Sequence, residues 1–306
     1  MKKNNILIIK HGAFGDLIQA DGIIKSIKMH HKNSNIVLLT STLYLNLMHK
    51  CPYIDEIFTD DRHPFFNVAY YVNFYKKIRK KNFSKIYDLQ NSYRTYIYRK
   101  YFFYKIKWVS TNRENHKKSG LQGLKEMLIK NNIEAKHLIK SNISWLATDV
   151  RGLLKKNKIS SNYLILLPGS SKKNSLKRWP YFKKLAQVLI IKNYEVVVVL
   201  GPEELELKDS IPGHIMKNLN WSQLAGIIKK SSYVIGNDSG PCHLASNLNK
   251  SGLAIFGPAT SPERAEIKKG KFDFIKVKDL FKLSPDEVFK KMKKMKKVKK
   301  MKKYSI

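Results

Sequence analysis

Short apolar runs alternate with longer amphipathic segments along the first half of the chain. Such runs predict buried strands, and apolar residues repeated every three or four positions predict helices. The expected strands are residues 6–9, 36–40, 56–59, 85–89 and 106–109, and the expected helices are 16–29, 43–49, 68–80 and 92–104. Because the strands alternate with helices, this half should form βαβ units around a parallel sheet.

The same alternation begins again after a lysine-rich segment at residues 147–162. The expected order is strand 163–167, a helix from Pro180, strand 196–200, helix 221–230, strand 233–236, helix 241–248 and strand 253–256. We therefore predict an α/β protein with two doubly wound, Rossmann-like domains, residues 1–146 and 163–280, joined by a linker at 147–162. Because such sheets bind ligands at the carboxyl ends of their strands, we expect both domains to face a central cleft.

The last segment, residues 281–306, opens with a helix-capping pattern, since Glu287 follows Ser284 by three positions. Beyond it, apolar residues recur every three positions, which is shorter than the helical turn of about 3.6 residues, so the apolar stripe winds around the helix. The stripe comprises Phe289, Met292, Met295, Val298 and Met301. It should make a poor fixed face, which leaves either a membrane-surface helix or a frayed, solvated tail.

Composition narrows the class of protein. A length of 306 residues suits two domains, and 43% hydrophobic residues can fill two cores. No apolar run approaches the roughly 18 residues that span a bilayer, and the run at 6–9 is too short for a signal peptide. We therefore expect a cytoplasmic protein. The two cysteines, Cys51 and Cys242, are far apart, which argues against a disulfide framework or a zinc site.

The formal net charge of +36 is the most unusual property of the chain. It favours an anionic partner such as a phosphorylated substrate or anionic lipid, although a composition biased toward Lys, Asn and Ile would also produce it. Residues 288–303 alone contain ten lysines and no acid, so we expect a peripheral contact with an anionic membrane surface. We find no helix-turn-helix, RNP-like or zinc-finger signature, so no specific nucleic-acid partner is expected.

Three polar segments after strands in the second half suit a diphosphate. The loop at 236–240, Gly-Asn-Asp-Ser-Gly, runs into a helix whose N–H groups and dipole attract anions, and His243 lies one turn further on. Lys177, which follows the strand-end loop containing Ser170, would neutralise a diphosphate leaving group. Glu203 could accept both hydroxyls of a ribose. The alternatives are a capped helix, a solvated basic loop and an ordinary helix-starting glutamate.

In the first half, the segment 10–16, Lys-His-Gly-Ala-Phe-Gly-Asp, connects the first strand to the first helix. Asp16 there suits a general base, and the alternative is a helix N-cap. The segment lacks the G-x-G start of the dinucleotide fingerprint. Arg62 and Arg94 also follow strands, and guanidinium groups match carboxylate and phosphate bidentately. Asp60 and Asp61 lack partner carboxylates, so no metal is expected.

Together these motifs resemble glycosyltransferase family 9, the lipopolysaccharide heptosyltransferase family. The similarity extends from the N-terminal strand-Gly-Asp segment to Phe-Gly-Pro at 256–258 and the residues after it, and leaves out only the lysine tail. The most specific motifs are Lys-Arg-Trp-Pro at 177–180, Gly-Asn-Asp-Ser-Gly-Pro at 236–241 with His243, and 256–258. The family often has a proline in the first helix, where this chain has Gln-Ala-Asp-Gly at 19–22.

The resemblance implies a GT-B fold and an inverting transfer that needs no metal or other cofactor. The donor, usually ADP-heptose, would bind the C-terminal domain. The acceptor, the Kdo-bearing or heptose-bearing inner core on lipid A, would bind the N-terminal one. We assign Asp16 as the catalytic base, Gly15, Arg62, Gln90 and Arg94 to the acceptor, and Ser170, Lys177, Glu203, Asp238, Ser239, Gly240 and His243 to the donor. The alternative is a nucleotide-sugar epimerase on the same fold, which would convert the donor without an acceptor.

Overall fold

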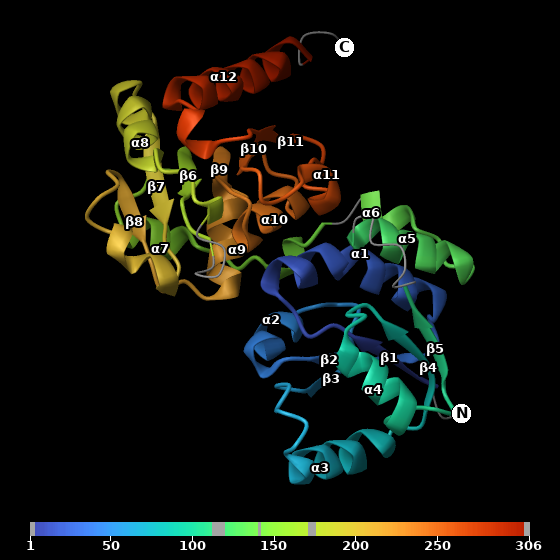
Figure 1. Ribbon diagram of the computed structural model, residues 1–306. Helices are drawn as coiled ribbons and strands as arrows, with labels where there is room; N and C mark the ends of the chain where they lie inside the picture. The colour runs from blue at the N-terminus through green and yellow to red at the C-terminus, as the bar shows by residue number, and fades with distance from the viewer. Residues whose placement is uncertain (1–3, 112–119, 140–141, 171–175, 303–306) are drawn as a thin grey trace. The chain divides into compact units, whose positions relative to one another are not determined.

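The computed structural model of the protein describes residues 4–111, 120–139, 142–170 and 176–302. The chain divides into two compact units, unit 1 at Met1–Leu146 and unit 2 at Ala147–Ile306. Each unit contains one parallel sheet with helices packed around it (Figure 1). The prediction of two doubly wound α/β units is therefore confirmed, and each unit is considered by itself below.

The sheet of unit 1 has the strand order β3-β2-β1-β4-β5, and all its pairings are parallel. Its strands are β1 (Asn5–Ile9), β2 (Asn35–Thr40), β3 (Glu56–Thr59), β4 (Phe83–Asp88) and β5 (Lys107–Ser110). The central strand β1 is buried on both faces by helices, which explains why it reads as a continuous apolar run. All five strands lie within two residues of their predicted bounds.

The helices of unit 1 include two that we did not predict from the sequence. The helices are α1 (Phe14–His30), α2 (Leu45–Met48), α3 (Val68–Arg79), α4 (Tyr93–Ile97), α5 (Gly120–Lys130) and α6 (Lys136–Ile139), with a π-helical turn at Tyr98–Phe102 and 3₁₀ turns at Thr42–Tyr44 and Ser144–Leu146. The unpredicted helices are α5 and α6. Helix α6 has only four residues, too few to show a helical repeat. Helix α5 buries Leu121, Leu124, Met127 and Leu128 at helical spacing, so its pattern was present in the sequence and was overlooked.

The residues that replace the family's proline in α1 have a packing role in this chain. A side chain at position 22 would place its Cβ 2.7 Å from the carbonyl oxygen of His137, so Gly22 allows α6 to lie directly against α1. One residue earlier, the buried Asp21 carboxylate accepts a hydrogen bond of 3.0 Å from the indole of Trp145. Asp21 and Gly22 therefore position Trp145 and the start of α6 against the first helix.

The sheet of unit 2 has the order β11-β10-β9-β6-β7-β8, again with parallel pairings. Its strands are β6 (Tyr163–Leu167), β7 (Glu195–Val199), β8 (His214–Met216), β9 (Tyr233–Asn237), β10 (Gly252–Phe256) and β11 (Phe272–Lys276). The two strands that the sequence did not reveal, β8 and β11, form the two edges of the sheet. Both are only partly buried, so neither is a continuous apolar run.

The helices of unit 2 begin inside the segment that we expected to be a linker. The helices are α7 (Arg151–Lys156), α8 (Phe182–Ile191), α9 (Trp221–Lys230), α10 (Gly240–Asn247), α11 (Pro262–Ala265) and α12 (Pro285–Lys302), with 3₁₀ turns at Pro202–Leu207 and Leu280–Lys282. Residues 147–162 contain α7, and their side chains at Val150, Leu154 and Ile159 are buried. This segment therefore folds with unit 2.

The lysine-rich helix α12 packs on unit 2 through its first half, which corrects the expectation of a poor fixed face. Val288 and Met292 are fully buried in the core cluster of unit 2, and Phe289 and Met295 pack against it. The expected three-residue stripe omitted Val288. Spacings of four and three residues from Val288 to Met292 to Met295 follow one face of a helix, and this face lies against α8. Among the described residues, no helix is both long and apolar enough to cross a membrane.

Candidate active site

The loops at the carboxyl edge of the unit 2 sheet are held together by Asn237, the last residue of β9. The Asn237 side chain is fully buried. Its Nδ2 donates a hydrogen bond of 2.6 Å to the carbonyl oxygen of Pro168, and its Oδ1 accepts one of 3.0 Å from the backbone N–H of Trp179. Three segments that are distant in the sequence, after β6, before α8 and after β9, therefore meet at one point.

Asp238 follows Asn237 and forms an ion pair with Lys177, the predicted phosphate-binding lysine. The Lys177 Nζ lies 2.9 Å from Asp238 Oδ2, and the His243 Nε2 lies 3.5 Å from Oδ1. Burial alone would raise the pKa of Asp238, but hydrogen bonds from His243, Lys177 and Thr260 hold that pKa well below its usual range. Asp238 thus stays ionised and fixes a lysine ammonium beside the 236–240 loop.

Ser239 and Gly240 begin helix α10. Ser239 occupies the N-cap position in an extended conformation, and Gly240 is the first helical residue. Within the described structure, the Ser239 side chain does not cap the helix. The N–H groups in the first turn of a helix have no intrahelical acceptor, and together with the helix dipole they attract an anion. The start of α10 and the Lys177 ammonium are therefore two groups at this edge that suit an anion, although Asp238 balances part of the lysine's charge.

Of the two glutamates at the start of the 3₁₀ turn after β7, Glu204 is buried, whereas the predicted Glu203 is exposed. Glu204 accepts a hydrogen bond of 2.9 Å from the backbone N–H of Gly201, and burial raises its pKa. Its carboxylate fills the space over Gly169, where a Cβ would lie only 2.5 Å from Glu204 Cδ. Glu204 therefore packs directly against the loop after β6 at Gly169.

Arg178 braces the same loop. Its guanidinium donates a hydrogen bond of 2.8 Å to the carbonyl oxygen of Ser170 and lies 3.5 Å from Glu204 and 3.3 Å from Glu206. Ser170 itself is buried. Neighbouring residues Lys177 and Arg178 thus have different roles, since the first faces Asp238 and the second holds the strand-end loop.

In unit 1, the predicted base Asp16 lies in the first turn of α1. Its carboxylate accepts a hydrogen bond of 3.2 Å from the backbone N–H of Ala13, and the side chain is exposed to solvent. The nearby Lys10 is buried, and its Nζ donates to the carbonyl oxygen of Leu89 at 3.3 Å. Burial lowers the pKa of Lys10, and the opposing charges of Asp16 and Asp88 raise it. Asp16 thus combines a helix-capping contact with solvent access beside a buried ammonium.

A buried network behind this loop uses the carboxylate of Asp60. Asp60 accepts hydrogen bonds from His11 Nε2 at 2.8 Å, Tyr98 Oη at 2.6 Å and Tyr70 Oη at 2.8 Å. Burial alone would raise the pKa of Asp60, but hydrogen bonds from His11 and Tyr98 hold it well below its usual range. Its neighbour Asp61 binds Thr42. Across the described parts of the chain, no group of three or more His, Cys, Asp or Glu residues is placed to hold a metal.

Of the residues predicted to bind the acceptor, Gln90 and Arg94 hold backbone groups, whereas the Arg62 side chain is exposed. Gly15 precedes Asp16 in the first turn of α1, and Gln90 Oε1 accepts a hydrogen bond of 3.2 Å from the His11 backbone N–H. The Arg94 guanidinium donates to the carbonyl oxygens of Arg62 at 3.1 Å and His63 at 2.9 Å, so it holds the loop after β3. The Arg62 side chain is exposed.

The structure therefore groups most of the predicted donor residues at one edge of unit 2 and places Gly15, Asp16 and Gln90 around one loop of unit 1. Sequence reasoning assigned no role to four further residues: Lys10, His11, Asn237 and Glu204. All are buried polar residues at or shortly after the end of a strand. A polar side chain at the end of an apolar run was a usable signal, because a buried polar group needs a specific partner.

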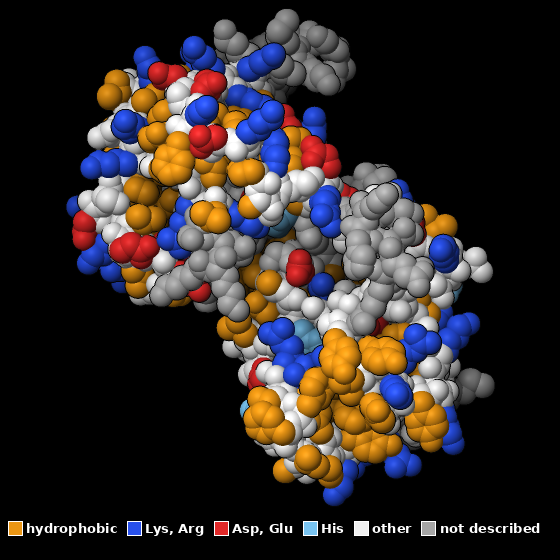
Figure 2. Space-filling view, viewed as in Figure 1, with side chains coloured by type: hydrophobic (Ala, Val, Ile, Leu, Met, Phe, Trp, Pro, Cys, Tyr) orange, Lys and Arg blue, Asp and Glu red, His pale blue; other side chains and the backbone are white. Residues whose placement is uncertain are grey.

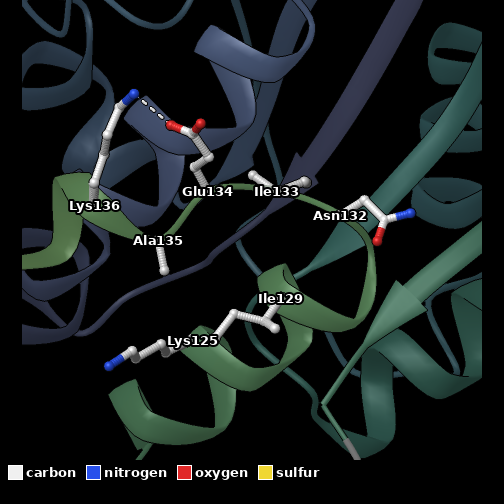
Figure 3. A pocket seen from close by; sticks show the side chains of 7 residues that line it. All are labelled: Lys125, Ile129, Asn132, Ile133, Glu134, Ala135 and Lys136. Carbon is white, nitrogen blue, oxygen red and sulfur yellow. Dashed lines mark ion pairs between the residues drawn. The ribbon is translucent and has the colours of Figure 1, made fainter.

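A hollow elsewhere in unit 1 contains none of the predicted site residues. It has a volume of about 430 Å³ and lies between α5 and the loop that leads to α6. Figure 3 shows the Glu134 and Lys136 side chains directed toward each other at its rim, where they form an ion pair. The hollow is shallow and wide open, so we do not assign it to the active site.

Comparisons with known proteins agree on one family. The family model for glycosyltransferase family 9 (heptosyltransferase) matches residues 109–304. Lipopolysaccharide heptosyltransferase 1 of Campylobacter coli is 24% identical over 300 residues, 85% of this chain and 86% of that protein. Glycosyl transferase family 9 from Veillonella parvula has a TM-score of 0.80 at 16% identity, over 95% and 97% of the two chains. Escherichia coli ADP-heptose lps heptosyltransferase II has a TM-score of 0.72 at 17% identity, over 95% and 98%.

These similarities confirm the resemblance inferred from the motifs and the GT-B fold of the two units. One detail is corrected, because the family match continues through α12 to residue 304 and does not stop before the lysine-rich segment. The match begins at residue 109, so the segment around Asp16 lies outside it. Since the match covers more than half of the chain, the protein belongs to glycosyltransferase family 9, the heptosyltransferase family, and is a glycosyltransferase.

Proposed function

We propose that the protein transfers a heptose from ADP-heptose to the inner core of lipopolysaccharide, with inversion at the anomeric carbon and without a metal ion. The observation that carries the donor side is the Lys177–Asp238 pair beside the start of α10. The names of two similar proteins support this choice of donor and acceptor. One is a lipopolysaccharide heptosyltransferase, and the other is an ADP-heptose lps heptosyltransferase.

In this reaction the bond between the anomeric carbon and the diphosphate breaks, and its electron pair leaves with ADP. Negative charge grows on the diphosphate as the bond lengthens. The Lys177 ammonium and the N–H groups at Ser239 and Gly240 stabilise that charge in place of a divalent cation. His243 and Asp238 hold the lysine and the loop, while Ser170 and Glu203 contact the nucleotide.

Asp16 takes the proton of the acceptor hydroxyl as its oxygen attacks the anomeric carbon from the face opposite the diphosphate, which gives inversion. An exposed carboxylate can reach an incoming hydroxyl, and Asp16 lies in the first turn of α1, next to the loop that holds the buried Lys10. Gly15, Gln90, Arg94 and the exposed Arg62 belong to the acceptor side. Arg62 suits an anionic sugar, whereas Arg94 acts by holding the loop that presents Arg62.

Incubation of the wild-type protein with ADP-heptose, with and without a core acceptor, tests this function. We expect release of ADP and a heptosylated acceptor only when both substrates are present, unchanged by a metal chelator. A donor that is isomerised in the absence of acceptor would instead support the epimerase. A panel of ADP-, UDP- and GDP-sugars in a thermal-shift assay identifies the nucleotide, and NMR of the product gives the anomeric configuration.

We further propose that the protein works at the cytoplasmic face of the inner membrane, where a lipid-linked acceptor would be found and an anionic surface attracts lysines. A truncation that tests this membrane contact must leave the buried face of α12 intact. Removing residues 288–306 would delete Val288 and Met292 from the core. Removing 296–306 deletes six lysines and spares that face, and it should weaken sedimentation with anionic vesicles. Unchanged sedimentation would show that this segment is not the attachment point.

A further inference from the structure

Unit 1 has a cluster of exposed aromatic and apolar side chains that none of the roles above uses. We call it the aromatic surface. It consists of Phe65, Tyr93 and Tyr96, whose rings lie close together, and of the exposed Phe66 and Val68, which follow Phe65 in the chain. Phe66 is 86% exposed and Tyr93 is 68% exposed. The rings of Phe65 and Tyr93, and those of Tyr93 and Tyr96, have centroids 6.4 Å apart. Hydrophobic side chains gather over α3 and α4 with lysines and arginines around them (Figure 2).

The aromatic surface is held in place by the interior of the unit. Arg94 lies 4.5 Å from the centroid of the Phe65 ring, and that ring stacks on Tyr71 at 5.5 Å. The same arginine fixes the carbonyl groups of residues 62 and 63. Large aromatic side chains held in exposed positions lose a substantial hydrophobic contribution unless a partner covers them, so a contiguous patch of this kind marks an interaction surface.

The charge around the aromatic surface indicates what that partner is. Residues 62–107 contain twelve lysines and arginines and a single acid, Asp88, which is buried. The partner must therefore be both apolar and anionic. The interface of an anionic bilayer has both properties, because aromatic rings settle at the boundary between headgroups and acyl chains while lysine and arginine bind the lipid phosphates.

The place of the aromatic surface in the fold links it to the predicted acceptor side. Phe65 and Phe66 lie on the loop after β3, close to Arg62, and Tyr93 follows Gln90 after β4. Both loops leave the carboxyl edge of the parallel sheet. A bilayer that contacts these rings would lie next to the residues expected to receive a lipid-linked sugar.

We propose that the aromatic surface is the lipid-contacting surface of unit 1 and that Phe66 and Tyr93 insert into the interface of an anionic membrane. Its use in presenting the acceptor rests on the proposed function, but the membrane contact does not. A net charge of +36 gives any variant some attraction to anionic lipid, so the test must leave charge unchanged.

The test compares the full chain with the double variant Phe66→Ser/Tyr93→Ser and with the matched control Phe281→Ser, an exposed ring of unit 2. Each is sedimented at physiological salt with phosphatidylcholine vesicles that do or do not contain phosphatidylglycerol. We expect the double variant to bind the anionic vesicles about tenfold more weakly than wild type and the control to bind normally. Equal binding of double variant and wild type, or no binding by wild type, would overturn the proposal.

Two further measurements distinguish a membrane-contacting surface from a dimer interface and from a sugar-binding surface. If the aromatic surface binds a second copy of the chain, ultracentrifugation without lipid will show an oligomer that the double variant lacks, which overturns the membrane assignment. Transfer to a water-soluble core oligosaccharide without lipid should be the same for wild type and double variant. A loss of that transfer would mean that the rings hold the sugar, also against the proposal. Failure of wild type to transfer would refute the enzymatic function and leave the vesicle result standing.

Discussion

The Lys177 ammonium lies 2.9 Å from the carboxylate of Asp238, a residue 61 positions later in the chain. One partner precedes α8 and the other follows β9, so the pair depends on the fold. The Asp238 carboxylate is buried, whereas Lys177 retains some solvent access. The aspartate therefore sets the position of the lysine, and the lysine remains able to meet an incoming anion.

Replacing Lys177 should impair the departure of the diphosphate. We expect Lys177→Met to lower kcat by about 10²–10³, because one preorganised cationic contact to a developing charge contributes on that scale. The control is Lys183→Met, which removes an exposed lysine from α8. Steady-state kinetics with ADP-heptose decide the matter. A Lys177 variant with wild-type kcat would remove this residue from the proposed mechanism.

Asn237 should matter for stability, because its side chain satisfies two backbone groups at once. In Asn237→Ala the Pro168 carbonyl and the Trp179 N–H both lose their partner in a buried environment. We expect a loss of about 2–4 kcal/mol in the free energy of unfolding. Urea denaturation measures it, with the exposed Asn162→Ala as the comparison. Equal stability of the two variants would mean that the loops do not depend on this bridge.

His31 should make stability depend on pH. Burial, together with the nearby charges of His30 and Lys85, lowers the pKa of His31 to about 4 from its ordinary 6.5. Between these values the unfolded chain binds a proton that the folded protein does not, so stability falls as pH decreases from 6.5 toward 4. The neutral ring also lies 2.8 Å from the Tyr87 hydroxyl.

The variant His31→Gln should lose this part of the pH dependence. Its deficit in unfolding free energy relative to wild type should shrink as pH falls from 6.5 to 4. Denaturation series at several pH values measure the effect, and the exposed His49→Gln serves as the control. A deficit that stays constant over this range would refute a depressed His31 pKa.

The docked half of α12 should contribute to the core of unit 2. Met292 is fully buried there, so Met292→Ala should cost about 2–5 kcal/mol of stability. Lys294, on the same helix, is exposed, and Lys294→Ala should change stability by less than about 0.5 kcal/mol. Thermal unfolding compares the two. Similar effects of both substitutions would favour the solvated tail that the sequence pattern left open.

Hydrophobic patterning predicted all five strands of unit 1 and the four inner strands of unit 2, and it missed the two edge strands of unit 2, β8 and β11. The central strands β1 and β6 are continuous apolar runs, so their bounds were readable. The edge strand β11, Phe-Asp-Phe-Ile-Lys, is neither a continuous apolar run nor a strict alternation, so its five residues could not be told from a loop. In helix α12 the helix itself was predicted, but its buried face was not. That face includes Val288 and is set by the contact with α8.

The sequence predicted which residue types form the candidate site, but it did not predict which groups their side chains contact. The order of Lys177 and the 236–240 loop predicted a phosphate site, and the structure brings Lys177 beside that loop. The sequence could not reveal that Arg94 holds a backbone loop or that Glu204 is buried while Glu203 is exposed. Adjacent residues of one type differ only in the direction of their side chains, which is set by the local turn.

The central claim is that Asp16 removes the acceptor proton, and the variant Asp16→Asn tests it most directly. The amide keeps an oxygen that can accept the hydrogen bond from the Ala13 N–H, so the start of α1 should persist. The account predicts a fall in kcat for heptose transfer of about 10²–10⁴, with the affinity for ADP-heptose unchanged in calorimetry. Turnover close to that of the wild type, with the same donor affinity, would contradict it.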